Sequence, residues 1–163
     1  RRRVAFVPGG PTSSHRERLA GYLLAQHEAG EPPILIDLQG DPLDRLVCAR
    51  VADRVIASEI DGVVCYPDVV AMGLILELLA RRIRVPEGVA VSGFEDLPIG
   101  DAFSIGLTTY GSDFEAIARR ALLVMAARIE NADAPPARIV VPGRMIVRES
   151  APGQVPDPSP EPK

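Results

Sequence analysis

The stretch from Asp61 to Asp96, DGVVCYPDVVAMGLILELLARRIRVPEGVAVSGFED, decides the fold. Its apolar run at 63–65 is too short for a helix and predicts a strand, which a Pro-Asp pair ends. A helix is predicted over 69–80, with three arginines crowded just beyond it, where they suit the carbonyl end of a helix dipole. A Pro-Glu-Gly turn breaks this helix before the next apolar run at 89–91. The order strand, crossover helix, strand predicts a parallel βαβ unit.

Both strands of this unit end in polar residues, and Glu95-Asp96 ends the second one. Ligands of open parallel sheets bind beyond the carboxyl ends of the strands, so we expect a binding crevice there. Neighbouring residues of a strand point to opposite faces. We therefore expect one carboxylate to face the crevice and the other to fix the loop, which weakens the case for an enzyme that uses both.

Strands alternate with helices along the rest of the chain up to residue 150, which predicts an α/β fold. Further strands are expected at 4–7, 34–36, 107–110, 139–141 and 145–147, and further helices over 15–29, 42–57 and 114–129. We expect three layers, with a parallel sheet covered by helices on both faces. Residues 1–150 would form one domain. Five of the thirteen residues at 151–163 are proline, which predicts a disordered tail.

Two of these helices carry more specific expectations. In the helix over 42–57, Asp41 suits the N-cap and Pro42 the first helical position. Its core-facing residues are expected to be Leu43, Leu46, Val47 and Val51. The helix over 114–129 is amphipathic, and Ser112 and Glu115 have the spacing of a capping box at its start.

Composition narrows the class of protein. The chain has 163 residues, 47% of them hydrophobic, and no apolar run long enough to span a membrane. A net charge of −4 argues against a surface dominated by nucleic-acid binding. The two histidines and two cysteines are not spaced as metal ligands, so we expect neither a metal nor a cofactor. The chain starts without Met, which suggests a fragment or a processed product, and no signal peptide is visible. The two cysteines indicate a reducing compartment, and we expect a cytoplasmic protein.

Two features at the start of the chain leave alternatives open. The Gly9-Gly10 loop joins a strand to a helix N-terminus, as phosphate-binding loops do. It lacks both the GxGxxG and the GxxxxGK[ST] patterns, so a tight βα turn is the favoured interpretation. Arg18 lies one helical turn further on, where its guanidinium would bind hydroxyls or a carboxylate, or would pair with a surface neighbour.

The helix over 69–80 is apolar around nearly its whole circumference, whereas a helix that lies on a sheet needs one apolar face. We expect the surplus face to form a homodimer interface rather than to be buried wholly inside the chain. The predicted contact residues are Met72, Ile75, Leu76 and Leu79, together with Phe103 from the loop that follows.

Several runs resemble the effector-binding domain of LacI/GalR-type transcriptional regulators. They are RRRVAFVPGG at 1–10, ERLAGY at 17–22, VCYPDVVAMG at 64–73, VPEGVAVSGFED at 85–96, LTT at 107–109 and IVRES at 146–150. The resemblance covers residues 1–150 and implies a periplasmic-binding-protein-like fold of two subdomains with a small ligand between them. It also implies that this chain lacks the DNA-binding helix-turn-helix headpiece and most of the first subdomain, to which the helix over 114–129 would cross.

The resemblance also implies site residues, position by position. Arg18 matches the ligand-gripping arginine, Glu95 the acidic residue that binds ligand hydroxyls, and Asp96 the aspartate after it. The last part of the site falls on Ser112 and Phe114. Two positions depart from the family: Pro67 replaces an asparagine and Pro42 replaces an aromatic platform. These changes predict either a ligand other than a standard pyranose or a pocket that no longer binds.

Taken together, these features predict a non-enzymatic sensor. It would be the effector-binding and dimerisation part of a bacterial regulator, responding to a sugar or related metabolite and reaching operator DNA only through the absent headpiece. The main competing hypothesis is a sugar-binding protein of a transporter, which a signal peptide upstream would favour and a helix-turn-helix upstream would exclude. Two further hypotheses are a small enzyme that uses Glu95 and Asp96 and a dimerisation module with a dead pocket.

Overall fold

A computed structural model describes residues 3–9, 13–41, 43–98, 104–133 and 135–153 of the chain. The predicted site residue Pro42, the predicted interface residue Phe103 and residues 154–163 of the predicted tail lie outside these ranges. Within them, no helix is long and apolar enough to cross a membrane.

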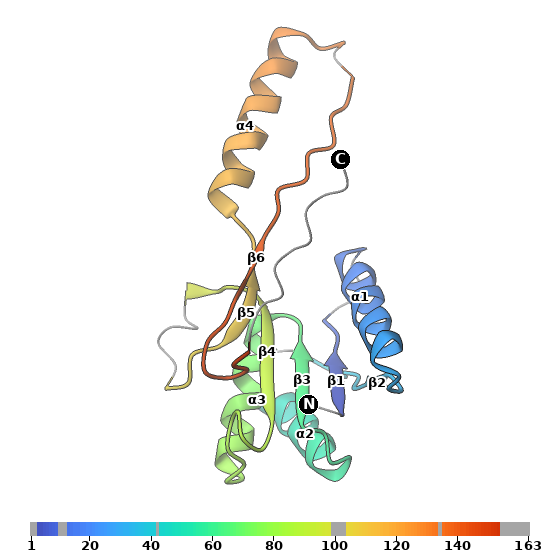
Figure 1. Ribbon diagram of the computed structural model, residues 1–163. Coiled ribbons are helices and arrows are strands. Elements are labelled where there is room, and N and C mark those ends of the chain that lie inside the picture. The colour runs from blue at the N-terminus through green and yellow to red at the C-terminus, as the bar shows by residue number, and fades with distance from the viewer. Residues whose placement is uncertain (1–2, 10–12, 42, 99–103, 134, 154–163) are drawn as a thin grey trace.

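A six-stranded sheet in the order β2-β1-β3-β4-β5-β6 forms the centre of the molecule (Figure 1). Its strands are β1 (Val4–Val7), β2 (Ile34–Leu35), β3 (Gly62–Cys65), β4 (Ala90–Glu95), β5 (Thr108–Gly111) and β6 (Arg144–Ile146). The first five are parallel, which confirms the predicted parallel α/β fold. The last strand, β6, is antiparallel to β5, and the predicted strand at 139–141 does not form.

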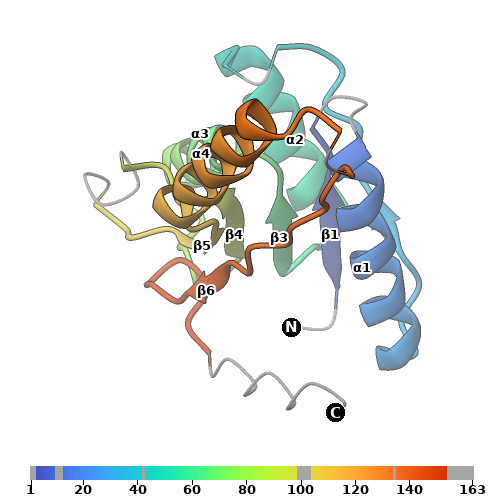
Figure 2. The same ribbon diagram turned by 90° about the horizontal axis from the view of Figure 1, so that it is seen from above.

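Helices cover both faces of the sheet, as expected. The helices that do so are α1 (Ser13–Ala29), α2 (Arg45–Ala57) and α3 (Asp68–Ala80), whereas a further helix, α4 (Phe114–Glu130), does not pack on the sheet. Side chains along β1 point alternately to the two faces of the sheet. Phe6 stacks on Tyr22 of α1 on one face, whereas Ala5 and Val7 join the core with α2 and α3 on the other face. In Figure 2, α2 and α3 lie next to each other on one side of the sheet, and α1 lies beside β1.

The surplus apolar face of α3 is mostly buried inside this chain, which corrects part of the predicted interface. Met72 is 6% exposed and Ile75 is 1% exposed, because both belong to the core that α2, α3 and the sheet share. Leu76 and Leu79 remain accessible at 54% and 36%. Apolar periodicity alone does not distinguish burial against a neighbouring helix from burial against a second subunit.

The start of α2 also differs from the prediction. The N-cap is Asp44, whose Oδ1 accepts a hydrogen bond from the backbone N–H of Leu46 at 2.8 Å. Asp41 instead accepts from the N–H of Leu43 in the turn before the helix, at 2.9 Å. Leu43 and Leu46 are exposed, contrary to the prediction, and Leu43 lies before the helix, whereas Val47 and Val51 are buried as predicted.

The last helix, α4, projects away from the sheet (Figure 1) and buries none of its side chains. Its N-cap is Asp113, which accepts from the N–H of Ala116 at 2.8 Å, rather than the predicted Ser112. Its large apolar side chains are exposed, among them Leu122 at 61% and Met125 at 55%. The predicted amphipathic face therefore has no buried contact within the described part of the chain.

Hydrogen bonds from the end of the chain lock β4 and β5 together. The Ser150 hydroxyl is buried, donates to the carbonyl of Val91 at 2.6 Å and accepts from the N–H of Thr108 at 2.8 Å. Thr108 Oγ1 donates to the carbonyl of Arg148 at 2.9 Å and accepts from its N–H at 2.8 Å. The LTT and IVRES runs, which are far apart in sequence, therefore form one clasp.

We predict that Ser150→Ala lowers the free energy of unfolding by about 1–3 kcal/mol, because it leaves a buried N–H and a buried carbonyl without their partner. Urea denaturation followed by circular dichroism measures this change. Ser104→Ala, at an exposed serine, is the matched control. Equal losses in the two variants would contradict the clasp.

Candidate ligand-binding site

The candidate site lies at the carboxyl edge of the sheet, where β3, β4 and β5 end. Arg18 reaches this edge from α1, and its Cζ lies 4.0 Å from the ring centroid of Tyr66 and 3.8 Å from that of Phe94. The two rings are nearly perpendicular, at 79°, with centroids 6.0 Å apart. We call this pair the aromatic corner. Cation–π attraction to each ring stabilises the guanidinium there.

Two N–H donors of Arg18 are relevant to ligand binding at this position. Its Nε and Nη1 are buried and have no hydrogen-bond partner among the residues that the structure describes. Buried N–H groups in native proteins are nearly always bonded to protein or to a bound molecule, and an unpaired one costs free energy. The two groups are therefore suited to bind oxygen atoms of a ligand.

Glu95, the last residue of β4, lies in an environment that disfavours its charge. Burial raises the pKa of its carboxyl group, and the negative charge of Asp68 raises it further, while Arg18 acts in the opposite direction. The backbone is also strained here, with φ of 124° at Glu95 and 54° at Asp96. Such values cost about 1–3 kcal/mol in residues other than glycine and cluster at functional sites.

Asp96 makes the contact expected of a loop-fixing residue. Its Oδ1 accepts from Nη2 of Arg148 at 3.0 Å, and Nη1 of the same guanidinium donates to the carbonyl of Leu107 at 2.8 Å. The two adjacent carboxylates therefore have different surroundings: Asp96 is held in an ion pair, whereas Glu95 interacts with Arg18 through charge.

Asp68 is the residue that sequence reasoning did not include in the site. This carboxylate is buried, and it accepts from Thr109 Oγ1 at 2.7 Å and from the N–H of Leu97 at 2.9 Å. A Cβ at Gly93 would overlap its Oδ1, so the glycine is required for this contact. The signal in the sequence was a charged residue between an apolar strand and a helix that is almost wholly apolar.

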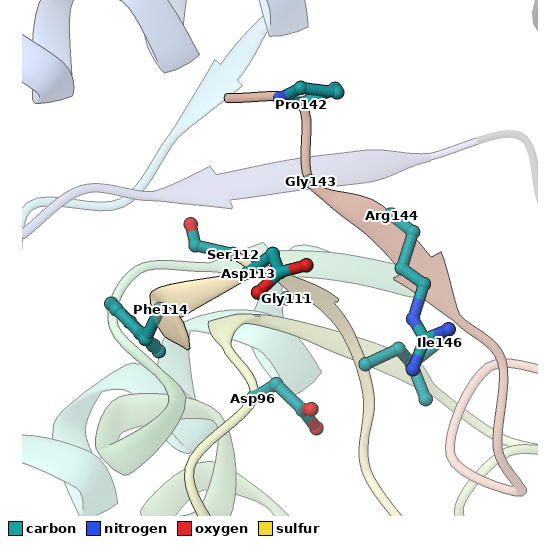
Figure 3. Close-up of a pocket in the computed structure, with 9 residues that line it drawn as sticks. All are labelled: Asp96, Gly111, Ser112, Asp113, Phe114, Pro142, Gly143, Arg144 and Ile146. Atoms are coloured by element: carbon teal, nitrogen blue, oxygen red, sulfur yellow. The ribbon is translucent and has the colours of Figure 1, made fainter. Parts of the chain in front are cut away.

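A polar pocket of about 370 Å³ adjoins these residues, at the base of α4 (Figure 3). Its lining includes three predicted site residues, Asp96, Ser112 and Phe114. The other lining residues come from the start of α4 and from the chain that returns to the sheet: Gly111, Asp113, Pro142, Gly143, Arg144 and Ile146. Sequence reasoning missed Arg144, although it lies just before the IVRES run, because that run was not expected to contribute to the site.

The predicted site residues thus fall into two neighbouring groups. The first group consists of Arg18, Pro67 and Glu95. Arg18 lies in the aromatic corner, and Pro67 follows Tyr66 in the chain as the N-cap of α3. The positive charge of Arg18 acts on the carboxyl group of Glu95. Asp96, Ser112 and Phe114 line the pocket. The groups adjoin because Glu95 pairs with Gly111 in the β4–β5 register. No group of three or more His, Cys, Asp or Glu side chains in the described ranges is arranged to hold a metal.

A family model described as a periplasmic binding protein-like domain matches residues 1–151, and the chain belongs to this family. Proteins similar to this chain include transcriptional regulators. The HTH-type transcriptional regulator GntR of Pseudomonas aeruginosa is 31% identical over 153 residues, which are 92% of this chain and 45% of that protein. This chain therefore spans about half the length of that relative.

Solved structures similar to this chain are also transcriptional regulators. A LacI-family regulator from Arthrobacter in complex with lactose has a TM-score of 0.78 and 26% identity, and the match covers 93% of this chain and 57% of that one. A complex of the transcriptional regulator CelR with cellobiose has a TM-score of 0.78 and 25% identity, with 92% and 47% covered. The resemblance to the effector-binding domain of LacI/GalR-type regulators is confirmed.

The raised pKa of Glu95 predicts a pH-dependent gain of stability in Glu95→Gln. At a pH above the pKa of Glu95 in the folded protein, keeping this carboxylate ionised lowers the free energy of unfolding. This destabilisation disappears as the pH falls below 4.5, the ordinary pKa of a glutamate side chain. Glu95→Gln should therefore melt at a higher temperature than the parent at pH 7, and the difference should vanish near pH 4. Thermal unfolding from pH 4 to 8 measures it, and the exposed Glu28→Gln controls for the lost charge. A difference that stays constant across this range would refute the argument.

Proposed function

We propose that this chain is the effector-sensing and dimerisation part of a bacterial LacI/GalR-type transcriptional regulator. Membership of the periplasmic binding protein-like family and the similarity to regulators support this assignment. Arg18 is the observation that carries it, because two buried guanidinium N–H groups without a partner among the described residues suit a bound ligand. The same relatives do not favour a transporter protein. The proposal requires a helix-turn-helix headpiece elsewhere in the full protein, which would act in the cytoplasm.

The effector in this proposal is a sugar or a related polyhydroxylated metabolite. Arg18 offers donors, Glu95 offers an acceptor, and the adjoining pocket adds the Ser112 hydroxyl and the charges of Asp113 and Arg144. Two similar regulators were solved with lactose and with cellobiose. Pro67 provides no side-chain amide for the ligand at its position, so we expect the ligand's contact there to differ from the one that an asparagine would make.

Binding rather than catalysis is the expected chemistry. A mechanism with two carboxylates needs both of them near the substrate, and here Asp96 is engaged with Arg148. Sensing would proceed by a shift of population: the effector favours the conformation to which it binds more tightly, and the dimer transmits that preference to the DNA-binding segment. Neither a metal nor a cofactor has a role in this proposal.

The homodimer contact in this proposal lies on the exposed parts of α2 and α3. The two helices are joined by an ion pair in which Arg45 Nε lies 2.8 Å from Glu77 Oε1. Exposed leucines flank both partners of this pair in sequence, Leu43 and Leu46 on one side and Leu76 and Leu79 on the other. An exposed apolar surface of this kind is typical of a protein–protein contact.

We predict that Arg18→Ala weakens effector binding by about 10- to 100-fold, since it removes charge-assisted hydrogen bonds to the ligand. A thermal-shift screen of mono- and disaccharides, starting with lactose and cellobiose, identifies the sugar, and calorimetry measures its affinity. Arg119→Ala, which changes an exposed arginine of α4, is the control. Equal affinity would remove Arg18 from the site. A screen in which no sugar raises the melting temperature would favour a dimerisation module with a dead pocket.

We predict that Leu76→Glu converts the dimer to a monomer, because it places a charge in the apolar contact. The substitution leaves the core intact, since Leu76 is half exposed in one chain. Light scattering after size-exclusion chromatography measures the mass. Leu24→Glu, at an exposed leucine of α1, should leave the dimer unchanged. A Leu76→Glu protein that keeps the dimer mass would place the contact elsewhere.

A further inference from the structure

Tyr66 connects three segments at the carboxyl edge of the sheet. Its backbone N–H donates to the carbonyl of Val7 at 3.0 Å, which extends the pairing of β1 with β3 by one residue. Its ring packs so closely on Gly9 that a Cβ there would overlap it. The same ring lies against Arg18 of α1 and against Phe94 of β4. Tyr66 is therefore fixed by the sheet at one end and meets Arg18 with its ring.

Arg18 depends on the aromatic corner for its orientation. Among the described residues, none forms an ion pair with Arg18 or a hydrogen bond to its Nε or Nη1. The attraction of Glu95 acts through charge and fixes no particular geometry. An arginine side chain has many rotamers, and holding it in one of them costs entropy that these ring contacts must offset.

The two rings of the corner differ in what else they do. Phe94 also stacks on Tyr110, with ring centroids 5.0 Å apart, and the Tyr110 hydroxyl accepts from the N–H of Gly143 at 3.0 Å. Removing Phe94 would therefore disturb the sheet and the pocket together. The Tyr66 ring contacts Gly9, Arg18 and Phe94, so a change there affects the guanidinium more selectively.

We infer that Tyr66 is a positioning residue of the site: its ring holds the Arg18 guanidinium so that Nε and Nη1 are presented to the effector. This inference rests on the proposed function for the identity of what Arg18 binds, but the orientation of Arg18 is a property of the unliganded protein. The competing explanation is a purely space-filling role for Tyr66 against Gly9. The two roles separate because leucine fills most of the space without offering a π face, whereas phenylalanine retains the ring.

Three variants of the chain test the inference by nitrogen–proton NMR of arginine side chains without ligand. Arg18→Lys identifies the Nε–H signal of Arg18 by its loss. In the parent and in Tyr66→Phe, we expect this signal to be displaced upfield by ring currents and to exchange slowly with water. In Tyr66→Leu, we expect it to move toward the signal of the exposed Arg119 and to exchange faster. Urea unfolding of each variant verifies that it is folded.

The outcomes are distinct. An Nε–H signal that is the same in Tyr66→Leu as in the parent would overturn the inference, as would an equal displacement in Tyr66→Phe and Tyr66→Leu. Calorimetry with cellobiose adds a second readout: Tyr66→Leu should bind about 3- to 30-fold more weakly than the parent, and Tyr66→Phe should restore binding. If the parent binds neither cellobiose nor lactose, that result counts against the proposed function for these sugars, while the NMR result still decides the role of Tyr66.

Discussion

The buried carboxylate of Asp68 is the constraint on which the carboxyl edge of the sheet depends. It is the first residue of α3, where the partial positive charge of the helix N-terminus favours an anion. Its oxygens bind Thr109 on β5 and the backbone of Leu97 beyond β4, and they leave no room for a side chain at Gly93. A buried charge is tolerated only when it is satisfied in this way. One side chain therefore fixes three segments relative to one another, and it also raises the pKa of Glu95.

Around this constraint, the residues proposed to bind an effector are each held in an unfavourable state. Burial and the charge of Asp68 disfavour ionisation of the Glu95 carboxyl group, and the backbone of Glu95 has a positive φ. Arg18 has buried N–H groups that lack partners among the described residues. Both costs fall when hydroxyl groups are supplied at the site. The rigid scaffold and the strained residues next to it are complementary, because strain persists only where the surrounding structure imposes it. The folding free energy lost through these unfavourable states would be regained when a ligand relieves them, and it would then add to the free energy of binding.

The sequence predicted the β3–α3–β4 unit well, because short apolar runs separated by proline and glycine leave few alternatives. It misplaced the start of α2, since Asp41 and Asp44 are both good caps and only the packing chooses between them. It placed Met72 and Ile75 at a subunit interface because the pattern does not reveal which neighbour covers an apolar face. Arg18 was singled out by its place one turn into the helix after the Gly9-Gly10 loop, and the family resemblance supported that choice. Its contact with Tyr66 and Phe94 joins residues distant in sequence, and no local pattern encodes such a meeting.

The exposure of α4 has a mechanical consequence. The chain enters this helix from β5 and returns from it through β6, and these two strands are hydrogen-bonded to each other, with Gly111 opposite Arg144. The helix is therefore joined to the rest of the domain only through a stem of two paired strands, β5 and β6, within the part of the chain that the structure describes. The pocket is lined by residues from both sides of the stem, Gly111 to Phe114 on one and Pro142 to Arg144 on the other. If the effector binds in this pocket, as proposed, it would contact both strands of the stem at the point where α4 leaves the sheet, and a small change of angle there would be amplified along the length of α4.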